Sequence, residues 1–383
     1  MSLIHHIRSV RNVAAFLLVL GGATAVASTG PSVATAEGDD VGVWVEREAP
    51  DQYWTSVAYG NGMFVAVGWF GDVEAMTSPD GIHWTAQPGM PRGDWRAIAF
   101  GAGRFVAVSG YMNTVATSTD GVTWTIQPTG VGGPTTVGYG NGTHVVLGII
   151  GDAASSTDGS TWYRRLGAPW GRWTDVAYGN GTFVVTADYT DSPGVLTSND
   201  GTSWTLRDTL DDCCWAAIEF GNGVFVAMPD TVPPPPTPQY PATSVDGITW
   251  KYGPEPTNGV WGGVTYGNDM FVAVRAMPDE FVGTPTVETS PDGSDWTDDT
   301  TSLTGDWQDI TYGNGTFVAV AASGARKVMT LRTSLPPDPE LPPDPELPKA
   351  GASTGIALAL AVGLLGAGWL LVRVATRTRF TRP

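Results

Sequence analysis

Apolar and polar residues alternate along short segments of this chain, and tight-turn dipeptides separate the segments. Between Trp54 and Trp84 this pattern predicts four β-strands, at residues 55–59, 63–67, 75–78 and 84–87. Asn61-Gly62 joins the first two strands, and Asp80-Gly81 joins the last two. Asn-Gly and Asp-Gly both favour the positive φ angles that a two-residue hairpin requires. We therefore expect this segment to form one four-stranded antiparallel sheet.

The same four-strand pattern returns along most of the chain. The first strand of each copy opens at Trp54, Trp95, Pro134, Trp173, Trp215, Trp261 or Trp307. The fourth strand opens with a second tryptophan, at Trp84, Trp124, Trp162, Trp204, Trp250 and Trp296. Successive openings lie 39 to 46 residues apart, which is the period of a four-stranded propeller blade. The sequence therefore predicts an all-β fold, a seven-bladed β-propeller at residues 37–334.

The seventh copy is one strand short. A third strand near residues 328–334 follows Trp307, but no closing tryptophan comes after it. A spare strand at residues 41–48 precedes the first copy, and its Trp44 matches the closing strands. Because an incomplete blade would leave an unpaired sheet edge, we expect the N-terminal strand to complete the last blade.

The connections between strands predict two unlike faces of the ring. The turns between strands one and two, and between strands three and four, are short and nearly invariant; we call their side the turn face. The remaining connections differ in length and chemistry; we call their side the variable face, and we expect any binding function there. We interpret the aspartates of the turn between strands three and four as structural: Asp80, Asp120, Asp158, Asp200, Asp246 and Asp292.

Both ends of the chain predict export and attachment to a surface. Residues 1–36 combine two arginines, an apolar run and small residues, which indicates a signal peptide. Residues 335–348 repeat Leu-Pro-Pro-Asp-Pro-Glu and predict an extended polyproline stalk. An uncharged apolar stretch at residues 356–372 predicts a membrane helix, and the arginines that follow it predict a cytoplasmic tail.

Charge narrows the choice of partners. Residues 37–350 hold all 38 Asp and Glu against 14 of the 20 Lys and Arg, a net charge of −24. Such a surface disfavours binding to nucleic acid.

We expect a monomer that carries no cofactor. The four histidines form no zinc-binding pattern.

Two segments resemble known families. The phrase Ser78-Pro-Asp80-Gly81-Ile-His-Trp84 resembles the Asp-box (BNR) repeat of sialidase-like propellers, although Asp and Gly are adjacent here. That resemblance implies a structural role for the turn residues. The C-terminus resembles the Gram-positive LPxTG cell-wall sorting signal, with Ala350 in the place of Thr. This second resemblance implies sortase and peptidoglycan as attachment partners and a cell-wall or cell-surface location for the exported protein. The sorting motif at residues 347–383 begins with Leu347, Pro348, Lys349, Ala350 and Gly351.

The variable face offers candidate binding residues. Aromatic side chains outside the repeat positions can stack on sugars or anchor a protein. Cys213 and Cys214 are adjacent before Trp215. Oxidation outside the cell would join them in a strained vicinal disulfide or link one of them to another molecule, and the alternative is two thiols. The residues that we select are Trp69, Tyr111, Trp170, Tyr189, Asp191, Cys213 and Cys214.

Three functions remain open. We favour a binding or adhesion module that recognises a glycan or a protein through the variable face. The alternative is a sialidase-like glycoside hydrolase that uses two loop carboxylates about 5–10 Å apart. A sialidase also needs a cluster of three arginines, and the propeller shows no such cluster at repeat-equivalent inner-strand positions. The third possibility is a passive wall-surface scaffold. We select no catalytic or metal-binding residue.

Overall fold

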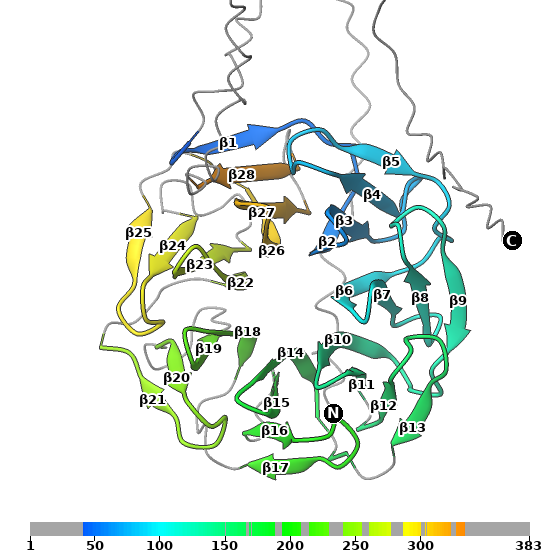
Figure 1. Cartoon of the computed structure of the whole chain (residues 1–383), viewed down its shortest axis with the longest axis vertical. Helices are drawn as coiled ribbons and strands as arrows, with labels where there is room; N and C mark the ends of the chain where they lie inside the picture. Colours follow the sequence, from blue (N-terminus) through cyan, green and yellow to red (C-terminus); the bar gives the residue numbers. More distant parts are fainter. Residues whose placement is uncertain are drawn as a thin grey trace, which may run out of the picture. The chain divides into compact units, whose positions relative to one another are not determined.

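A computed structural model shows seven four-stranded antiparallel sheets arranged as a closed ring (Figure 1). The predicted all-β, seven-bladed propeller is confirmed. The structure describes residues 41–149, 151–165, 168–169, 171–187, 194–207, 214–229, 240–254, 260–276, 286–299, 303, 305–322 and 327–333. The chain divides into two units, Met1–Leu335 and Pro336–Pro383, and the second lies wholly outside the described residues.

Each blade has strands A to D in order from the ring axis outward. Strand A is β2 (Trp54–Gly60), β6 (Trp95–Gly101), β10 (Pro134–Gly140), β14 (Trp173–Gly179), β18 (Trp215–Gly221), β22 (Trp261–Gly267) or β26 (Trp307–Gly313). Strand B is β3 (Met63–Gly68), β7 (Arg104–Ser109), β11 (Thr143–Gly148), β15 (Thr182–Ala187), β19 (Val224–Pro229), β23 (Met270–Arg275) or β27 (Thr316–Ala321). Strand C is β4 (Ala75–Ser78), β8 (Thr114–Ser118), β12 (Ala153–Ser156), β16 (Val195–Ser198), β20 (Ala242–Ser244), β24 (Val287–Ser290) or β28 (Val328–Arg332). Strand D is β5 (Thr85–Gln87), β9 (Thr125–Pro128), β13 (Tyr163–Arg165), β17 (Thr205–Arg207), β21 (Lys251–Tyr252), β25 (Thr297–Asp299) or β1 (Trp44–Arg47).

The N-terminal strand completes the last blade, as predicted. β1 pairs with β28, with Trp44 opposite Leu331 and Arg47 opposite Val328 (Figure 1). The paired segment is shorter than the predicted residues 41–48, and Val41 adds only an isolated bridge. Blade 7 therefore draws its strands from both ends of the propeller, and this sheet closes the ring.

A glycine and an aromatic ring hold each blade against the next. Strand A ends in glycine in every blade, and a Cβ added there would lie 2.0–2.1 Å from the nearest ring atom of a Tyr or Phe in the following blade. Gly60 receives Phe100, and Gly313 receives Tyr59 of blade 1, so the same contact also closes the ring. The repeated Tyr-Gly and Phe-Gly dipeptides therefore supply the ring and the glycine of the contacts between blades.

The A–B turns also join neighbouring blades. Asn61 and Gly62 have φ angles of +50° and +75°, as a two-residue hairpin demands. The Asn61 Nδ2 donates hydrogen bonds to the carbonyl oxygens of Gly103 and Thr119, both in blade 2, at 3.0 and 3.1 Å. Asn180 makes the same pair of bonds to blade 5. Asparagine thus supplies both the turn conformation and a bond to the next blade.

In six blades, one aromatic residue of strand B packs in the core between its own blade and the preceding one. Phe64, Phe105, Phe183, Phe225, Phe271 and Phe317 are fully buried in six blades. Blade 3 has His144 at this position, equally buried, with its ring 4.7 Å from that of Tyr139. The corresponding ring pair in blade 4 is also 4.7 Å apart. His144 thus takes the place of a core phenylalanine.

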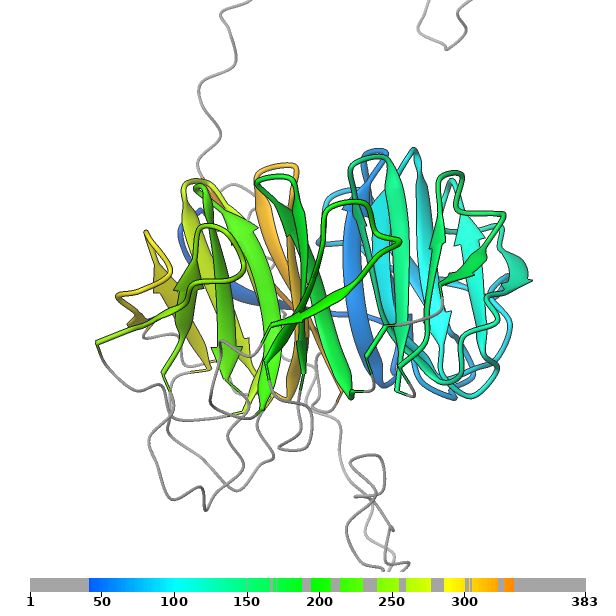
Figure 2. The same cartoon turned by 90° about the horizontal axis from the view of Figure 1, so that it is seen from below.

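The two faces of the ring are built as expected from the turns. In Figure 2 the A–B turns lie at the upper end of the ring, and the described blade-to-blade connections lie at the lower end. The predicted signal peptide, stalk, sorting signal and membrane helix lie outside the described residues. Within the described ranges, no helix is long and apolar enough to cross a membrane.

Candidate functional site

The structure describes three of the seven residues that we selected for binding. They are Trp69, Tyr111 and Cys214. Trp170, Tyr189, Asp191 and Cys213 lie outside the described residues. Cys214 is half-buried with a φ angle of +82°. The alternatives for Cys213 and Cys214, a vicinal disulfide, an intermolecular link or thiols, all stay open.

Trp69 and Tyr111 belong to one group of rings that spans blades 1 and 2. Phe70 lies between them, with its ring centroid 5.9 Å from that of Trp69 and 6.0 Å from that of Tyr111. Tyr53 meets Trp69 edge to face at 5.6 Å. Tyr111, Phe70 and Tyr53 are 78%, 42% and 37% exposed. We call these four residues the aromatic cluster.

Backbone hydrogen bonds fix the loop that carries the cluster. The amide of Trp69 donates to the Tyr53 carbonyl at 2.9 Å, and the amide of Phe70 donates to the Gly93 carbonyl at 2.9 Å. Trp69 also forms an isolated antiparallel bridge with Asp94. The loop of blade 1 therefore lies directly on the connection that opens blade 2.

Gln52 closes the other side of this loop. Its Nε2 donates to the Val73 carbonyl at 2.8 Å, and its Oε1 accepts from the Tyr53 amide at 2.7 Å. A Cβ on Gly71 would lie 1.7 Å from the Gln52 Nε2, so a larger residue there would displace the Gln52 side chain. Gln52 is nearly buried. The exposed rings therefore stand on a rigid support.

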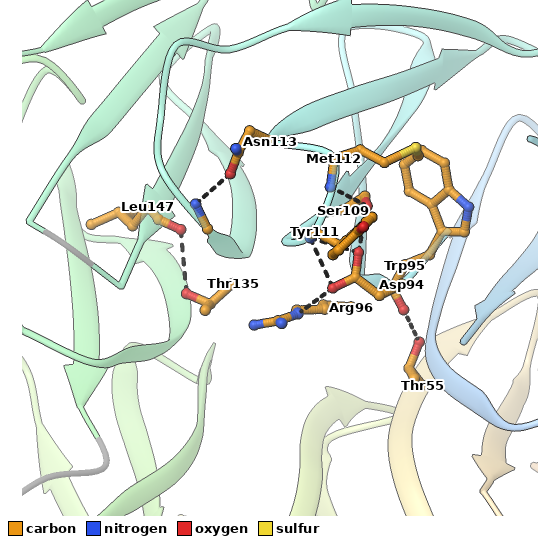
Figure 3. Close-up of polar contacts among 11 residues, drawn as sticks. Thr55, Asp94, Trp95, Arg96, Ser109, Tyr111, Met112, Asn113, Thr135 and Leu147 are labelled. Carbon is orange, nitrogen blue, oxygen red and sulfur yellow. Dashed lines mark hydrogen bonds and ion pairs between the residues drawn. The ribbon is translucent and has the colours of Figure 1, made fainter. Parts of the chain in front are cut away.

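Asp94 is the polar centre beneath the cluster (Figure 3). Its Oδ1 accepts from the Ser109 Oγ at 2.6 Å and from the Tyr111 amide at 2.7 Å, and its Oδ2 accepts from the Arg96 Nε at 3.1 Å. The Asp94 residue is only 2% exposed. Asp94 therefore positions both Tyr111 and Arg96 and does not itself reach solvent.

Arg96 departs from its repeat equivalents. At the same position of strand A, Thr55, Thr135 and Thr174 donate hydrogen bonds to the carbonyl that opens the next blade's strand A, at 2.7–2.8 Å. The Arg96 guanidinium instead packs over Gly110, and its side chain is 41% exposed. Figure 3 shows its terminal nitrogens turned away from Asp94. Donors of Arg96 therefore lie beside Gly110, the residue before Tyr111, on the variable face.

Glu74 is buried under the same loop. The residue is 3% exposed, and neither carboxyl oxygen has a hydrogen bond of good geometry within the described structure. Burial raises the pKa of Glu74 to about 7, although the nearby amides of Gly93 and Gly71 act in the opposite direction. The side chain thus lies between the loop of blade 1 and the opening of blade 2.

Three acids on inner strands also have raised pKa values. Burial raises the pKa of Glu219 to about 8, of Asp309 to about 7 and of Asp175 to about 6. Each of the three residues is half-buried. Asp309 accepts hydrogen bonds from the Ser56 Oγ and the Val57 amide across the ring closure, at 2.7 and 2.9 Å. Asp175 accepts from the Ile218 amide of the next blade at 3.0 Å. Asp175 and Asp309 therefore help to join the blades.

The aspartates of the C–D turns have a repeated local geometry. In blade 3, the Asp158 Oδ1 accepts from the amides of Ser160 and Thr161 at 2.8 and 2.7 Å, and from the Ser156 Oγ at 2.9 Å. The amides of Thr161 and Ser160 hold the pKa of this carboxyl well below its usual range. The same bonds from the two following amides recur at Asp80, Asp120, Asp200, Asp246 and Asp292.

The described acids near the aromatic cluster do not form an open catalytic pair. Glu74 and Asp94 are both buried, and three donors occupy Asp94. Asp72 is exposed at the tip of the loop. Within the described part of the chain, no three His, Cys, Asp or Glu side chains come close enough to hold a metal ion.

Sequence reasoning missed part of this arrangement. It selected Trp69 and Tyr111 but not Tyr53, Phe70, Asp94 or Arg96. One signal was present: Gly93-Asp94-Trp95 recurs as Gly305-Asp306-Trp307, so the acid before the opening tryptophan is itself a repeated feature. In both copies that acid accepts from the residue after the tryptophan, Arg96 or Gln308.

No protein-family model matches the chain, and no curated protein sequence matches it. Solved structures do resemble it. Virginiamycin B lyase from Staphylococcus aureus has a TM-score of 0.61 at 9% identity over 75% of this chain and 97% of that one. YCF48 bound to D1 peptide has a TM-score of 0.55 at 14% identity, over 76% and 97%. The GH74 enzyme of Niastella koreensis has a TM-score of 0.54 at 16% identity, over 74% and 44%. At these identities the likeness concerns the fold alone, and the chain is a seven-bladed β-propeller.

Proposed function

We propose that the protein is a recognition module that binds a saccharide on its variable face, with the aromatic cluster as the binding platform. The observation that supports this proposal is the group of exposed rings on a hydrogen-bonded support. Rings held in advance bind at a lower entropic cost than mobile ones. Aromatic faces stack well against the apolar faces of sugars, and the polar edges of Tyr53, Tyr111 and Trp69 remain available for hydroxyl groups.

The size of the cluster favours a saccharide over a protein. An aromatic side chain buries about 150–250 Å² when fully covered, so the exposed parts of Tyr53, Phe70 and Tyr111 offer on the order of 300 Å². A stable protein–protein interface needs about 800 Å² on each partner. The cluster alone is too small for that task, but it matches one or a few sugar rings.

Arg96 supplies the polar side of the proposed site. Its terminal nitrogens carry hydrogen-bond donors, and its Nε is fixed by the buried Asp94. The backbone amide of Tyr111 donates to the same carboxylate, so one acid anchors both residues. A sugar stacked on Tyr111 would thus meet donors for its hydroxyl oxygens.

We further propose that this module is exported and held at the cell surface. The signal-peptide pattern at residues 1–36, the proline-rich stalk and the LPxTG-like C-terminus support this location. Sortase and peptidoglycan are the proposed attachment partners. The Asp-box relationship is likewise a proposal; it is supported by the Ser-Asp-Gly-Trp spacing of the C–D turns.

A saccharide-array screen of residues 37–334 tests the proposed function. We expect binding without cleavage of the bound sugar. For a sugar identified in this way, Tyr111→Ala should weaken binding about 10- to 100-fold, because one stacked ring contributes roughly 1–3 kcal/mol. The affinity is measured by titration calorimetry.

Tyr163→Ala is the matched control. Tyr163 is also an exposed tyrosine, at 58%, but it lies on the outer strand β13 of blade 3. Its removal should leave the affinity unchanged. Equal losses in both variants, or full affinity in Tyr111→Ala, would show that the cluster is not the binding platform. Release of a cleaved sugar would instead support the hydrolase alternative, and an array without any signal would support the scaffold.

A further inference from the structure

Glu74 occupies a repeat position at which the other described ionisable residues, Asp152 and Lys327, have partners. The position immediately precedes strand C, and its carbonyl accepts from the end of strand B in blades 1, 3, 6 and 7. Asp152 of blade 3 forms a bidentate ion pair with Arg164, with both contacts at 2.7 Å. Thr286 of blade 6 donates to the Leu303 carbonyl at 2.8 Å, and Lys327 of blade 7 donates to the Ala322 carbonyl at 3.0 Å. Glu74 is the ionisable residue here that lacks such a bond within the described structure.

The side chain of Glu74 lies where the aromatic cluster meets blade 2. The nearby amides belong to Gly71, in the loop that carries the rings, and to Gly93, in the opening of blade 2. The Gly93 carbonyl also accepts a hydrogen bond from the Phe70 amide, and this bond fixes the loop. A charge at Glu74 would therefore be buried between the two surfaces whose contact holds the rings in place. Burying an unpaired charge is costly, and opening the loop would hydrate it.

We propose that Glu74 is a proton-operated latch: the loop of Trp69 and Phe70 stays packed on blade 2 while the Glu74 carboxyl is protonated, and it loosens when that carboxyl ionises. The consequence for ligand affinity rests on the proposed function of the aromatic cluster. The latch itself does not, because it can be measured without a ligand.

The charged groups around Glu74 determine the direction of the effect. Arg92, exposed in the opening of blade 2, favours the ionised form, whereas the buried Asp94 beside it favours the protonated form. Burial outweighs both, so the pKa of Glu74 is about 7 in the packed loop against an ordinary value of 4.5. Packing is therefore favoured most below pH 4.5 and is progressively lost as the pH rises towards 7.

Amide hydrogen exchange in the unliganded protein tests the latch. The reporters are the amides of Trp69 and Phe70, followed from pH 4.5 to 7.5 and corrected for their intrinsic exchange rates. A pKa difference of this size predicts a fall in protection of about two orders of magnitude over that range. The internal reference is the Ile149 amide of blade 3, which makes the equivalent bond to the Gly133 carbonyl at 3.2 Å. Its protection should not show this fall.

Glu74→Gln keeps the shape of the side chain but removes the charge. Protection of Trp69 and Phe70 in this variant should be independent of pH. Glu74→Thr, which introduces the residue type found at Thr114 and Thr286, should behave in the same way. Flat protection in the unmutated protein, or an equal fall in both variants, would overturn the latch. Refutation of the latch would leave the proposal of saccharide binding by the cluster standing, so the two proposals fail separately.

Discussion

Carboxyl groups play two opposite electrostatic roles in this propeller, and the position in the repeat decides which. Asp158, on an exposed turn, accepts from two successive amides that lower its pKa, so its contribution to stability is lost in acid. Asp309, on an inner strand, has its pKa raised to about 7 by burial, so its ionisation costs stability between pH 3.8 and 7. Glu74 belongs to the second class but lacks the hydrogen bonds of Asp309. Side-chain type alone therefore predicts little about function here.

His144 is the core residue least suited to its surroundings. Its ring fills the space of a phenylalanine, and neither ring nitrogen has a hydrogen bond of good geometry within the described structure. Burial, with a smaller contribution from Arg104, lowers its pKa to about 4 from 6.5. The folded state must keep the ring neutral, so the stability that His144 allows is lost as the pH falls from 6.5 towards 4.

His144→Phe should therefore stabilise the propeller. We expect the free energy of unfolding to rise by about 1–2 kcal/mol at pH 7.5, because two buried unpaired nitrogens are removed. The gain should be about 2.5 kcal/mol larger at pH 4.5, where histidine is protonated mainly in the unfolded chain. Urea unfolding at the two pH values measures both differences. A gain that is the same at both pH values would contradict a neutral buried histidine.

At the scale of elements, the blades are joined by contacts that involve the ends of strand A. Gly140, the last residue of β10, receives the ring of Tyr178 from blade 4, and Asp175 near the other end of β14 accepts the amide of Ile218 from blade 5. Both contacts involve successive blades. Each blade therefore stabilises its neighbours, as expected for a repeat protein whose units pack side by side.

Gly140→Ala should destabilise the ring, because the new Cβ would lie 2.0 Å from the Tyr178 ring. We expect a loss of about 3 kcal/mol in the free energy of unfolding, the upper end for overpacking a close contact. Urea unfolding measures it. Gly142→Ala is the control in the adjacent turn: its φ angle is +73°, but nothing lies within 4 Å. That variant should lose only about 1 kcal/mol from backbone strain. Equal losses would argue against the inter-blade contact.

At the scale of the whole molecule, the periodic features were predictable and the site was only partly so. The spacing of Trp54, Trp95 and their equivalents predicts the blades, and the missing last strand predicts the pairing of β1 with β28. Repetition makes these signals strong, because each copy tests the same interpretation. The variable face also follows from the unequal loops.

The inner structure of the site depends on contacts between blades, which no periodic pattern reports. Asp94 precedes an opening tryptophan and could have been an exposed loop acid, but its contacts with Ser109 and Tyr111 bury it. Glu74 was recognisable as a loop acid, whereas its burial depends on Gly93 of the next blade. Tyr53 joins the cluster because Trp69, sixteen residues later, folds back beside it. Sequence patterns reveal the scaffold better than they reveal such individual departures from it.

The most direct test of the central claim is a hydrogen-exchange footprint of the propeller with a saccharide identified on the array. If the aromatic cluster is the binding platform, added protection should be confined to blades 1 and 2 on the variable face, around Tyr53, Trp69–Phe70 and Ser109–Asn113. The Asp158 turn on the opposite face should be unaffected. Protection that appears on the turn face, or on the variable face of other blades without blades 1 and 2, would contradict the account.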